Sequence, residues 1–163
     1  YHEYGHYVDD VYGGIRDDGL SEGWGDVIAV LVSQQPLVGK GLQGDLRALR
    51  RGDNTYQFPA RPESEEVHRL GQAWAGFVWH LREELSRSLP LAQADKLTRE
   101  LVLPSLLSNA FDIPSCVREV LVRDDNNGNL RDGTPHQAAI LAAVVDQNRH
   151  ATINRLGDLR IPV

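Results

Sequence analysis

Two histidines one helical turn apart are the residues of this chain best suited to carry chemistry. Residues 2–6 read H-E-Y-G-H, so His2 and His6 are four positions apart and Glu3 follows the first of them. On an α-helix, side chains with this spacing lie on one face, and both imidazoles can bind one metal ion with Glu3 beside it. Two histidine ligands and an open position for water are typical of catalytic Zn²⁺ sites. The alternative is a surface helix that carries these residues by chance.

A catalytic zinc site needs a third protein ligand, and residues 21–26, S-E-G-W-G-D, offer one. The longer H-E-x-x-H-x-x-G-x-x-H pattern is excluded, because Asp9 and Tyr12 stand at its glycine and histidine positions. We therefore predict Glu22 as the third ligand and Asp26 as the acceptor of the free N–H of a ligating histidine. The two glycines, which are costly inside an ordinary helix, are expected to let this helix press against the first. An acidic first turn favoured by the helix dipole is the alternative, but it leaves the glycines unexplained.

These motifs resemble those of the fungalysin family of zinc metallopeptidases, and more broadly those of thermolysin-like enzymes (gluzincins), whose third zinc ligand is a glutamate on a following helix. Residues 67–75, V-H-R-L-G-Q-A-W-A, are similar to a helix start of that family, and residues 116–124, C-V-R-E-V-L-V-R-D, are a degraded version of another. The resemblance covers most of the chain. It implies a zinc endopeptidase in which Glu3 takes a proton from a zinc-activated water and passes it to the leaving amine.

The resemblance also implies residues that act on the substrate. His68 matches the histidine that donates to the oxyanion in thermolysin-like enzymes, with Glu63 or Glu66 as an acidic neighbour that orients it. A histidine that packs or caps the helix start is the alternative. Arg50, slightly preferred over Arg51, is similar to the arginine that contacts substrate carbonyls, and an exposed basic pair explains these two residues equally well.

Four other tyrosine and histidine residues are weaker candidates for this site. Tyr12 is the nearest candidate for the second oxyanion donor of the family, although the connection between His6 and Glu22 is short. His136 ranks after His68 as the first donor. His80 and His150 have no accompanying motif, so we expect them in the core or on the surface.

The turn-rich residues 124–129, D-D-N-N-G-N, resemble the middle of a calcium loop. Arg123 and Thr134 stand where the first and last carboxylate ligands of an EF-hand belong, so a complete EF-hand is excluded. A turn built from asparagine and glycine is the favoured explanation, and a partial Ca²⁺ site stays open as the weaker one.

Composition limits the class of protein. The chain has 163 residues, of which 41% are hydrophobic and 25% charged, which is typical of one globular domain with a real core. Its net charge is −6, and no basic run is dense enough to follow a phosphate backbone, which argues against nucleic acid as a partner. No apolar run approaches the length of a membrane span. Cys116, the single cysteine, cannot form an internal disulfide.

Helices are expected to position the site, because the apolar spacing follows the helical period and the alternation typical of strands is nearly absent. We predict a helix-rich series of six segments, at about residues 1–12, from an N-cap at Ser21 toward Pro36, 65–86, 91–110 with a break at Pro104, 116–123 and 135–146. Residues 36–62, rich in Gly, Pro, Arg and Asp, are expected to form a long ordered loop. The predicted fold class is all-α, a single bundle-like domain over residues 1–163.

In thermolysin-like enzymes a mainly β lobe precedes the metal helix and supplies an edge strand that pairs with the substrate backbone. The resemblance therefore implies that this chain is the C-terminal helical half of a two-lobed catalytic domain. It also implies an N-terminal lobe or propeptide on the same precursor, peptides or proteins as substrates, and secretion. The alternative hypothesis is a non-catalytic zinc-binding or structural helical module of a larger secreted or surface protein. Zinc content and peptide cleavage with and without Glu3→Gln separate the two hypotheses.

Overall fold

The computed structural model describes residues 1–59 and 61–144 in full, and only the backbone of residues 145–146 and 150–151. These residues form six α-helices: α1 (His2–Val11), α2 (Asp18–Ser33), α3 (Val67–Ser86), α4 (Leu91–Leu106), α5 (Ile113–Asp124) and α6 (Gln137–Val144). Two short 3₁₀ turns are η1 (Pro62–Ser64) and η2 (Leu130–Asp132), and two antiparallel pairs of short strands are β1 (Leu37–Val38) with β2 (Arg50–Arg51) and β3 (Val145–Asp146) with β4 (His150–Ala151). The mainly helical architecture predicted from the sequence is confirmed. None of the described helices combines the length and the apolar character needed to cross a membrane.

α2 starts earlier than the sequence predicted. Its N-cap is Asp17, whose carboxylate accepts the backbone N–H of Leu20 at 2.6 Å. The predicted cap at Ser21 was wrong, because an aspartate four residues earlier satisfies the free amides of the first turn. The hydroxyl of Ser21 is thereby left free for another partner on α1.

α4 and α5 also differ from their predicted limits. Pro104 lies inside α4 without breaking it, and the helix ends at Leu106 rather than near residue 110. α5 begins three residues before the predicted start at Cys116, because the carboxylate of Asp112 accepts the backbone N–H of Ser115 at 2.8 Å and caps the helix. The earlier start of α5 comes from this cap, which the apolar spacing does not report.

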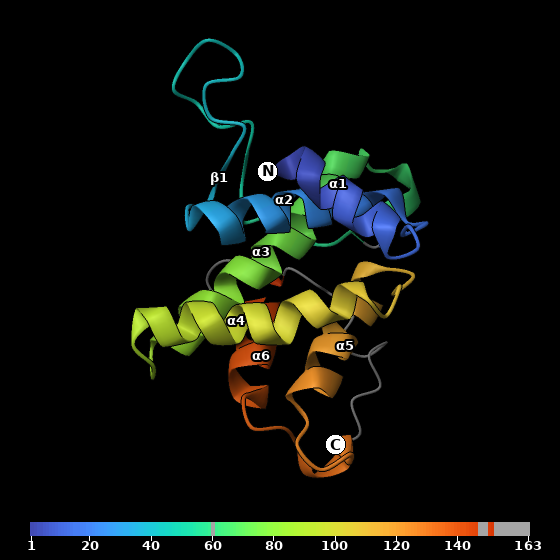
Figure 1. Ribbon diagram of the computed structural model, residues 1–163, viewed down its shortest axis with the longest axis vertical. Helices are drawn as coiled ribbons and strands as arrows, with labels where there is room; N and C mark the ends of the chain where they lie inside the picture. The colour runs from blue at the N-terminus through green and yellow to red at the C-terminus, as the bar shows by residue number, and fades with distance from the viewer. Residues whose placement is uncertain (60, 147–149, 152–163) are drawn as a thin grey trace.

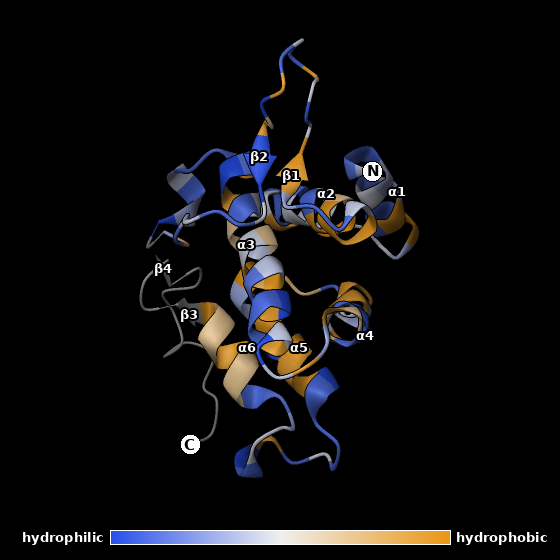
Figure 2. Ribbon diagram, turned by 90° about the vertical axis from the view of Figure 1, so that its left-hand side faces the viewer, coloured by the Kyte–Doolittle hydropathy of each residue, from blue (hydrophilic) through white to orange (hydrophobic). Residues whose placement is uncertain are grey.

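Within residues 36–62, which the sequence predicted as a long ordered loop, two short strands pair as a hairpin. Val38 of β1 pairs with Arg50 of β2, and in the view coloured by hydropathy β1 is hydrophobic and β2 hydrophilic (Figure 2). Val38 is buried in a cluster with Ala29, Val30 and Trp79, which fixes this hairpin to α2 and α3. The turn between the strands projects away from the helices (Figure 1). Strands of two residues are too short to show alternation in a sequence.

α2 contacts both α1 and α3 through glycines. A Cβ at Gly5 of α1 would lie 2.7 Å from the Cα of Gly25, and a Cβ at Gly71 of α3 would lie 2.6 Å from the backbone nitrogen of Gly23. Because no side chain stands between them, α2 approaches both neighbours closely. Gly25 faces α1 as expected, but the expectation that Gly23 also faces α1 was wrong. We call these four residues the glycine interface.

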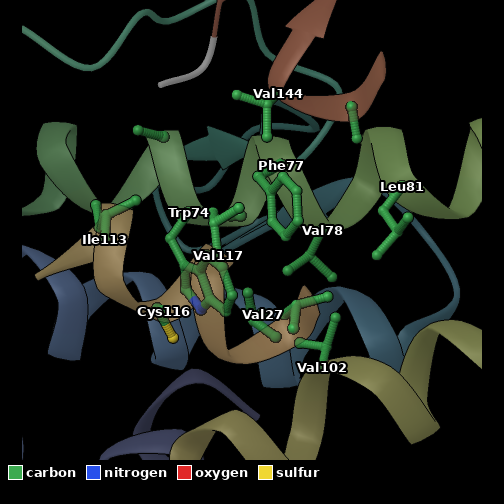
Figure 3. Close-up of a cluster of buried hydrophobic side chains, with 14 of the residues drawn as sticks. Val27, Trp74, Phe77, Val78, Leu81, Val102, Ile113, Cys116, Val117 and Val144 are labelled. Atoms are coloured by element: carbon green, nitrogen blue, oxygen red, sulfur yellow. The ribbon is translucent and has the colours of Figure 1, made fainter. Parts of the chain in front are cut away.

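The apolar core is centred on α3, which packs against α2 on one side and against α4 and α6 further along, with α5 also contributing to the cluster (Figures 1 and 3). Trp74 and Phe77 stack with ring centroids 5.3 Å apart, and Trp24 of α2 meets Trp74 edge-on at 5.3 Å. Burying each large apolar side chain contributes about 1.5–3 kcal/mol. Figure 3 shows how buried side chains from α2 to α6 fill this space; the largest of the fully buried ones include Trp74, Phe77, Val78, Leu81 and Ile113.

Candidate metal centre

His2 and His6 of α1 converge with Glu22 of α2. His2 Nε2 lies 3.2 Å from Glu22 Oε2, His6 Nε2 lies 3.7 Å from Glu22 Oε1, and the two Nε2 atoms are 3.1 Å apart. One ligand atom from each residue lies within 4.8 Å of the others, and no other group of three or more His, Cys, Asp or Glu side chains in the described part of the chain does so. The structure thus brings together the three residues that the sequence predicted as metal ligands.

The carboxylate of Glu22 carries the clearest sign that a cation fits between these residues. Its Oε2 atom is buried and accepts no hydrogen bond from the described residues. The ring nitrogens of His2 and His68 lie 3.2 and 3.3 Å away, but not in hydrogen-bonding alignment. A buried acceptor without a partner costs about 1–3 kcal/mol, and a bound cation removes that cost. Two imidazoles and one carboxylate are the donor set of many catalytic Zn²⁺ sites.

Asp26 holds the imidazole of His2 from the side opposite Glu22. Its Oδ1 atom lies 2.8 Å from His2 Nδ1, as the sequence predicted for a partner of a ligating histidine. The hydrogen bond to Asp26 raises the pKa of His2, against the opposing effect of burial. Burial also raises the pKa of Asp26, but the hydrogen bonds from His2 and Arg50 outweigh it, and the net pKa is lowered.

Arg50 extends this arrangement by one more residue. Its Nε and Nη2 atoms donate to the two carboxylate oxygens of Asp26 at 2.7 and 2.8 Å, and Nη2 lies 3.2 Å from His2 Nδ1. The hydrogen bond to Asp26 raises the pKa of Arg50. The hairpin β1–β2 places Arg50 here, whereas Arg51 points outward and pairs with Asp53 at the surface. Arg50, predicted as a substrate-binding residue, therefore lies beside the centre with its guanidinium engaged by Asp26.

His6 has a partner that the sequence analysis did not find. Ser21 Oγ lies 3.4 Å from His6 Nδ1 and donates to Asp9 Oδ2 at 2.8 Å. Asp9 is buried, and its other carboxylate oxygen accepts the backbone N–H of Ile15 at 2.9 Å. The signal in the sequence was present, because Asp9 follows His6 by three positions on the same helix and Ser21 directly precedes the third ligand.

His68, the predicted oxyanion donor, lies at the centre. Its Nε2 atom is 3.3 Å from Glu22 Oε2, and its Nδ1 atom is 2.5 Å from Glu66 Oε1. Glu66 also caps α3 by accepting the backbone N–H groups of His68 and Arg69, and the hydrogen bond from His68 lowers its pKa. Of the two acidic neighbours predicted, Glu66 rather than Glu63 is thus the one that orients the imidazole. An open hollow of about 420 Å³ adjoins His68 and is lined by Leu49, Arg50, Glu66, His68, Arg69 and Gln72.

Other predicted residues lie at or away from the centre. Glu3 is exposed in the first turn of α1, directly after His2. Tyr12 ends the same helix, about 15 Å along its axis from His2, and its ring is half exposed, so the structure does not bring it to the ligands. His80 is buried, between Glu83 and the carbonyl of Asn54, which agrees with a core role.

The α5–α6 loop lies at the opposite end of the molecule from α1 (Figures 1 and 2). It carries His136, whose Nδ1 lies 2.6 Å from Asp124 Oδ1, so His136 is not a rival of His68 at the metal centre. The turn-forming residues Asp125 and Asn127 accept backbone N–H groups two residues further on, at 3.0 and 2.9 Å. The loop is therefore the asparagine turn that the sequence favoured, and Ca²⁺ binding there stays a prediction. His150 lies where only the backbone is described.

Comparison with known proteins identifies no relative of this chain. The chain matches no protein-family model, no curated protein and no solved structure.

Proposed function

We propose that this chain is the helical part of a zinc-dependent endopeptidase. The observation that carries the proposal is the convergence of His2, His6 and Glu22 within 4.8 Å around a buried oxygen without a hydrogen bond. Asp26 and Ser21 support two of these ligands from outside, an arrangement common to histidine-containing metal sites. Zn²⁺, when bound, supplies the Lewis acidity that brings the pKa of water from 15.7 to about 7.

The residues around the ligands divide the remaining work of peptide hydrolysis. Glu3, exposed beside His2, is the proposed base that accepts the proton of the attacking water and transfers it to the leaving amine. His68, whose Nδ1 is held by Glu66, is the proposed donor to the oxyanion, a contribution of several kcal/mol in comparable sites. Arg50 lines the hollow beside His68 and is the proposed contact for a substrate carbonyl.

The test combines zinc content with peptide cleavage. We expect the wild-type chain to bind one Zn²⁺, Glu22→Ala to lose it, and Glu3→Gln to keep it. Cleavage of a peptide library is measured in the longest natural form of the protein that contains this chain. There, Glu3→Gln should reduce cleavage by about 10²- to 10⁴-fold, while the matched control Glu63→Gln, which changes an exposed acid outside the centre, should not.

Each failure has a separate meaning. Retention of zinc in Glu22→Ala would move the third ligand elsewhere. Unchanged cleavage in Glu3→Gln would remove Glu3 from the mechanism. A wild-type chain that binds no zinc would end the proposal.

A non-catalytic zinc-binding module is the second candidate, and one observation favours it. The two histidines lie on α1 and Glu22 lies on α2, so a bound ion would cross-link two helices that otherwise meet closely at Gly5 and Gly25. Both candidates predict that zinc stabilises the fold. Only the peptidase predicts cleavage that depends on Glu3.

A further inference from the structure

We propose that Asp9 and Ser21 act together as positioning residues that fix the tautomer of His6, so that its Nε2 lone pair faces the metal. This inference rests on the proposed function, since it concerns how one of the three ligands is prepared. It names two residues that no metal-binding motif predicted.

The arrangement begins with a buried carboxylate. Asp9 is 4% exposed, and both of its oxygens act as acceptors. Oδ1 accepts the backbone N–H of Ile15 at 2.9 Å, and Oδ2 accepts the hydroxyl of Ser21 at 2.8 Å. The bond to Ile15 fixes the carboxylate relative to the turn that follows α1, and the bond to Ser21 joins α1 to α2.

The count of protons then determines the role of the histidine. A serine hydroxyl has one hydrogen to donate, and in Ser21 it is directed to Asp9. Ser21 Oγ, 3.4 Å from His6 Nδ1, can therefore act toward that nitrogen only as an acceptor. This contact therefore favours a hydrogen on His6 Nδ1. The unprotonated Nε2 atom then faces Glu22 Oε1 and His2 Nε2 at 3.7 and 3.1 Å, and a cation between these acceptors would remove their mutual repulsion.

The tautomer of His2 is fixed in the same way, by a direct bond to a carboxylate. Asp26 accepts directly from His2 Nδ1 at 2.8 Å, whereas Asp9 acts on His6 through one intervening hydroxyl. Both carboxylates thus direct an Nε2 lone pair toward the same point. Because the Asp9 arrangement depends on the direction of one O–H bond, reversing that direction should reverse the tautomer.

Asp9→Asn provides this reversal with little change in shape. The asparagine oxygen can keep the bond from the Ile15 N–H, which turns the amide NH₂ toward Ser21 Oγ. The hydroxyl hydrogen then points to His6 Nδ1 and favours the tautomer with hydrogen on Nε2. The exposed neighbour Asp10 supplies the matched control, Asp10→Asn.

The experiment reads the tautomer of His6 from nitrogen chemical shifts in the metal-free chain, and zinc affinity from competition with a chelator. In the wild type we expect the hydrogen on Nδ1. In Asp9→Asn we expect it on Nε2, with zinc affinity reduced about 10- to 100-fold. Ser21→Ala should give a mixture of tautomers and weaker zinc binding, whereas Ser21→Thr, which keeps the hydroxyl, and Asp10→Asn should match the wild type.

Two results would overturn the inference. One is a wild-type His6 that carries its hydrogen on Nε2. The other is an Asp9→Asn variant, folded by circular dichroism, with wild-type tautomer and zinc affinity. Failure of the proposed function is distinguishable from both, because it is the absence of zinc binding in the wild type, and the tautomer is read without metal.

Discussion

At the glycine interface, a Cβ added at Gly71 would lie 2.6 Å from the Gly23 nitrogen, while further along the same helix α3 the large buried side chains of Phe77 and Leu81 stand between α3 and its neighbours in the apolar core. The first contact joins backbone to backbone, and we expect it to fix the position of α2 and with it the direction of Glu22. The second contact buries large side chains, which is where most of the stabilising free energy of a domain arises. The comparison suggests that geometry of the centre and stability of the fold are carried by different parts of one helix.

The largest expected effect lies in the apolar core. Phe77 is fully buried against Trp74, and Phe77→Ala leaves a cavity, so we expect a loss of about 3–5 kcal/mol in the free energy of unfolding. Chemical denaturation measures this loss. Phe111→Ala, at a side chain that is 72% exposed, is the control and should change stability by less than about 0.5 kcal/mol. If a folded Phe77→Ala variant lost zinc as severely as Glu22→Ala, the core and the metal centre would not have separate roles.

Gly71→Ala tests the other side of the comparison. Its Cβ would lie 2.6 Å from the Gly23 nitrogen and 3.0 Å from the Glu22 carbonyl carbon, so α2 and α3 must move apart. We expect a loss of about 1–3 kcal/mol in stability together with weaker zinc binding, although Gly71 supplies no ligand. Gly52→Ala, where a Cβ would meet only ordinary contacts of 3.4 Å or more, should change neither. Wild-type zinc affinity in a folded Gly71→Ala variant would show that this contact does not fix Glu22.

We expect zinc affinity to fall as the pH is lowered, because His2 becomes protonated. The bond to Asp26 raises the pKa of His2 above the ordinary value of 6.5, and zinc needs the neutral imidazole. Below that raised pKa, affinity should fall about tenfold, or 1.4 kcal/mol, per pH unit. For the metal-free fold the sign is opposite, since protonated His2 stabilises it below pH 6.5 and this stability is lost as pH rises through the raised pKa.

Chelator competition between about pH 5 and about pH 8 measures this dependence. Asp26→Asn should move the loss of affinity to lower pH, because the bond that raises the His2 pKa is weakened. A pH profile identical in the two proteins would mean that Asp26 does not control the protonation of His2.

The smallest expected effect is the reactivity of the Cys116 thiol, which lies in the apolar core. The thiol is fully buried, and burial raises its pKa to about 12, so almost no thiolate exists near neutral pH. We expect no reaction with a thiol-specific reagent at about pH 8 until the chain is unfolded, when one thiol per chain should react. Complete labelling of the folded protein within minutes would show that the core opens more readily than its packing indicates.

The sequence predicted much of the site because its motifs are local. The spacing of His2 and His6 places both on one helical face in any α-helix, and the acid at residue 22 stands in a motif whose glycines signal close packing. Asp26 was predicted as a partner of a ligating histidine for the same reason of helical spacing. The helices around these residues were also predictable from apolar periodicity, with errors at N-termini where Asp17 and Asp112 act as caps.

Other features depended on contacts between residues far apart in the chain. The hairpin that carries Arg50 to Asp26 has strands too short to leave a periodic signal. Ser21 was assigned to a helix cap because its nearest sequence neighbours suggested one, and only the packing of α1 on α2 brings it between Asp9 and His6. Gly23 was assigned to the wrong neighbour because a sequence shows that a glycine is present but not which helix approaches it.

The amino-acid sequence by itself therefore determined which groups are candidates to bind a metal and which side of each helix carries them, since covalent spacing and helical geometry suffice for that. The tertiary structure alone decided which carboxylate supports which histidine, where Arg50 lies, and that His68 rather than His136 reaches Glu22. These depend on hydrogen bonds and backbone contacts between elements, and such contacts are set by how the whole chain packs.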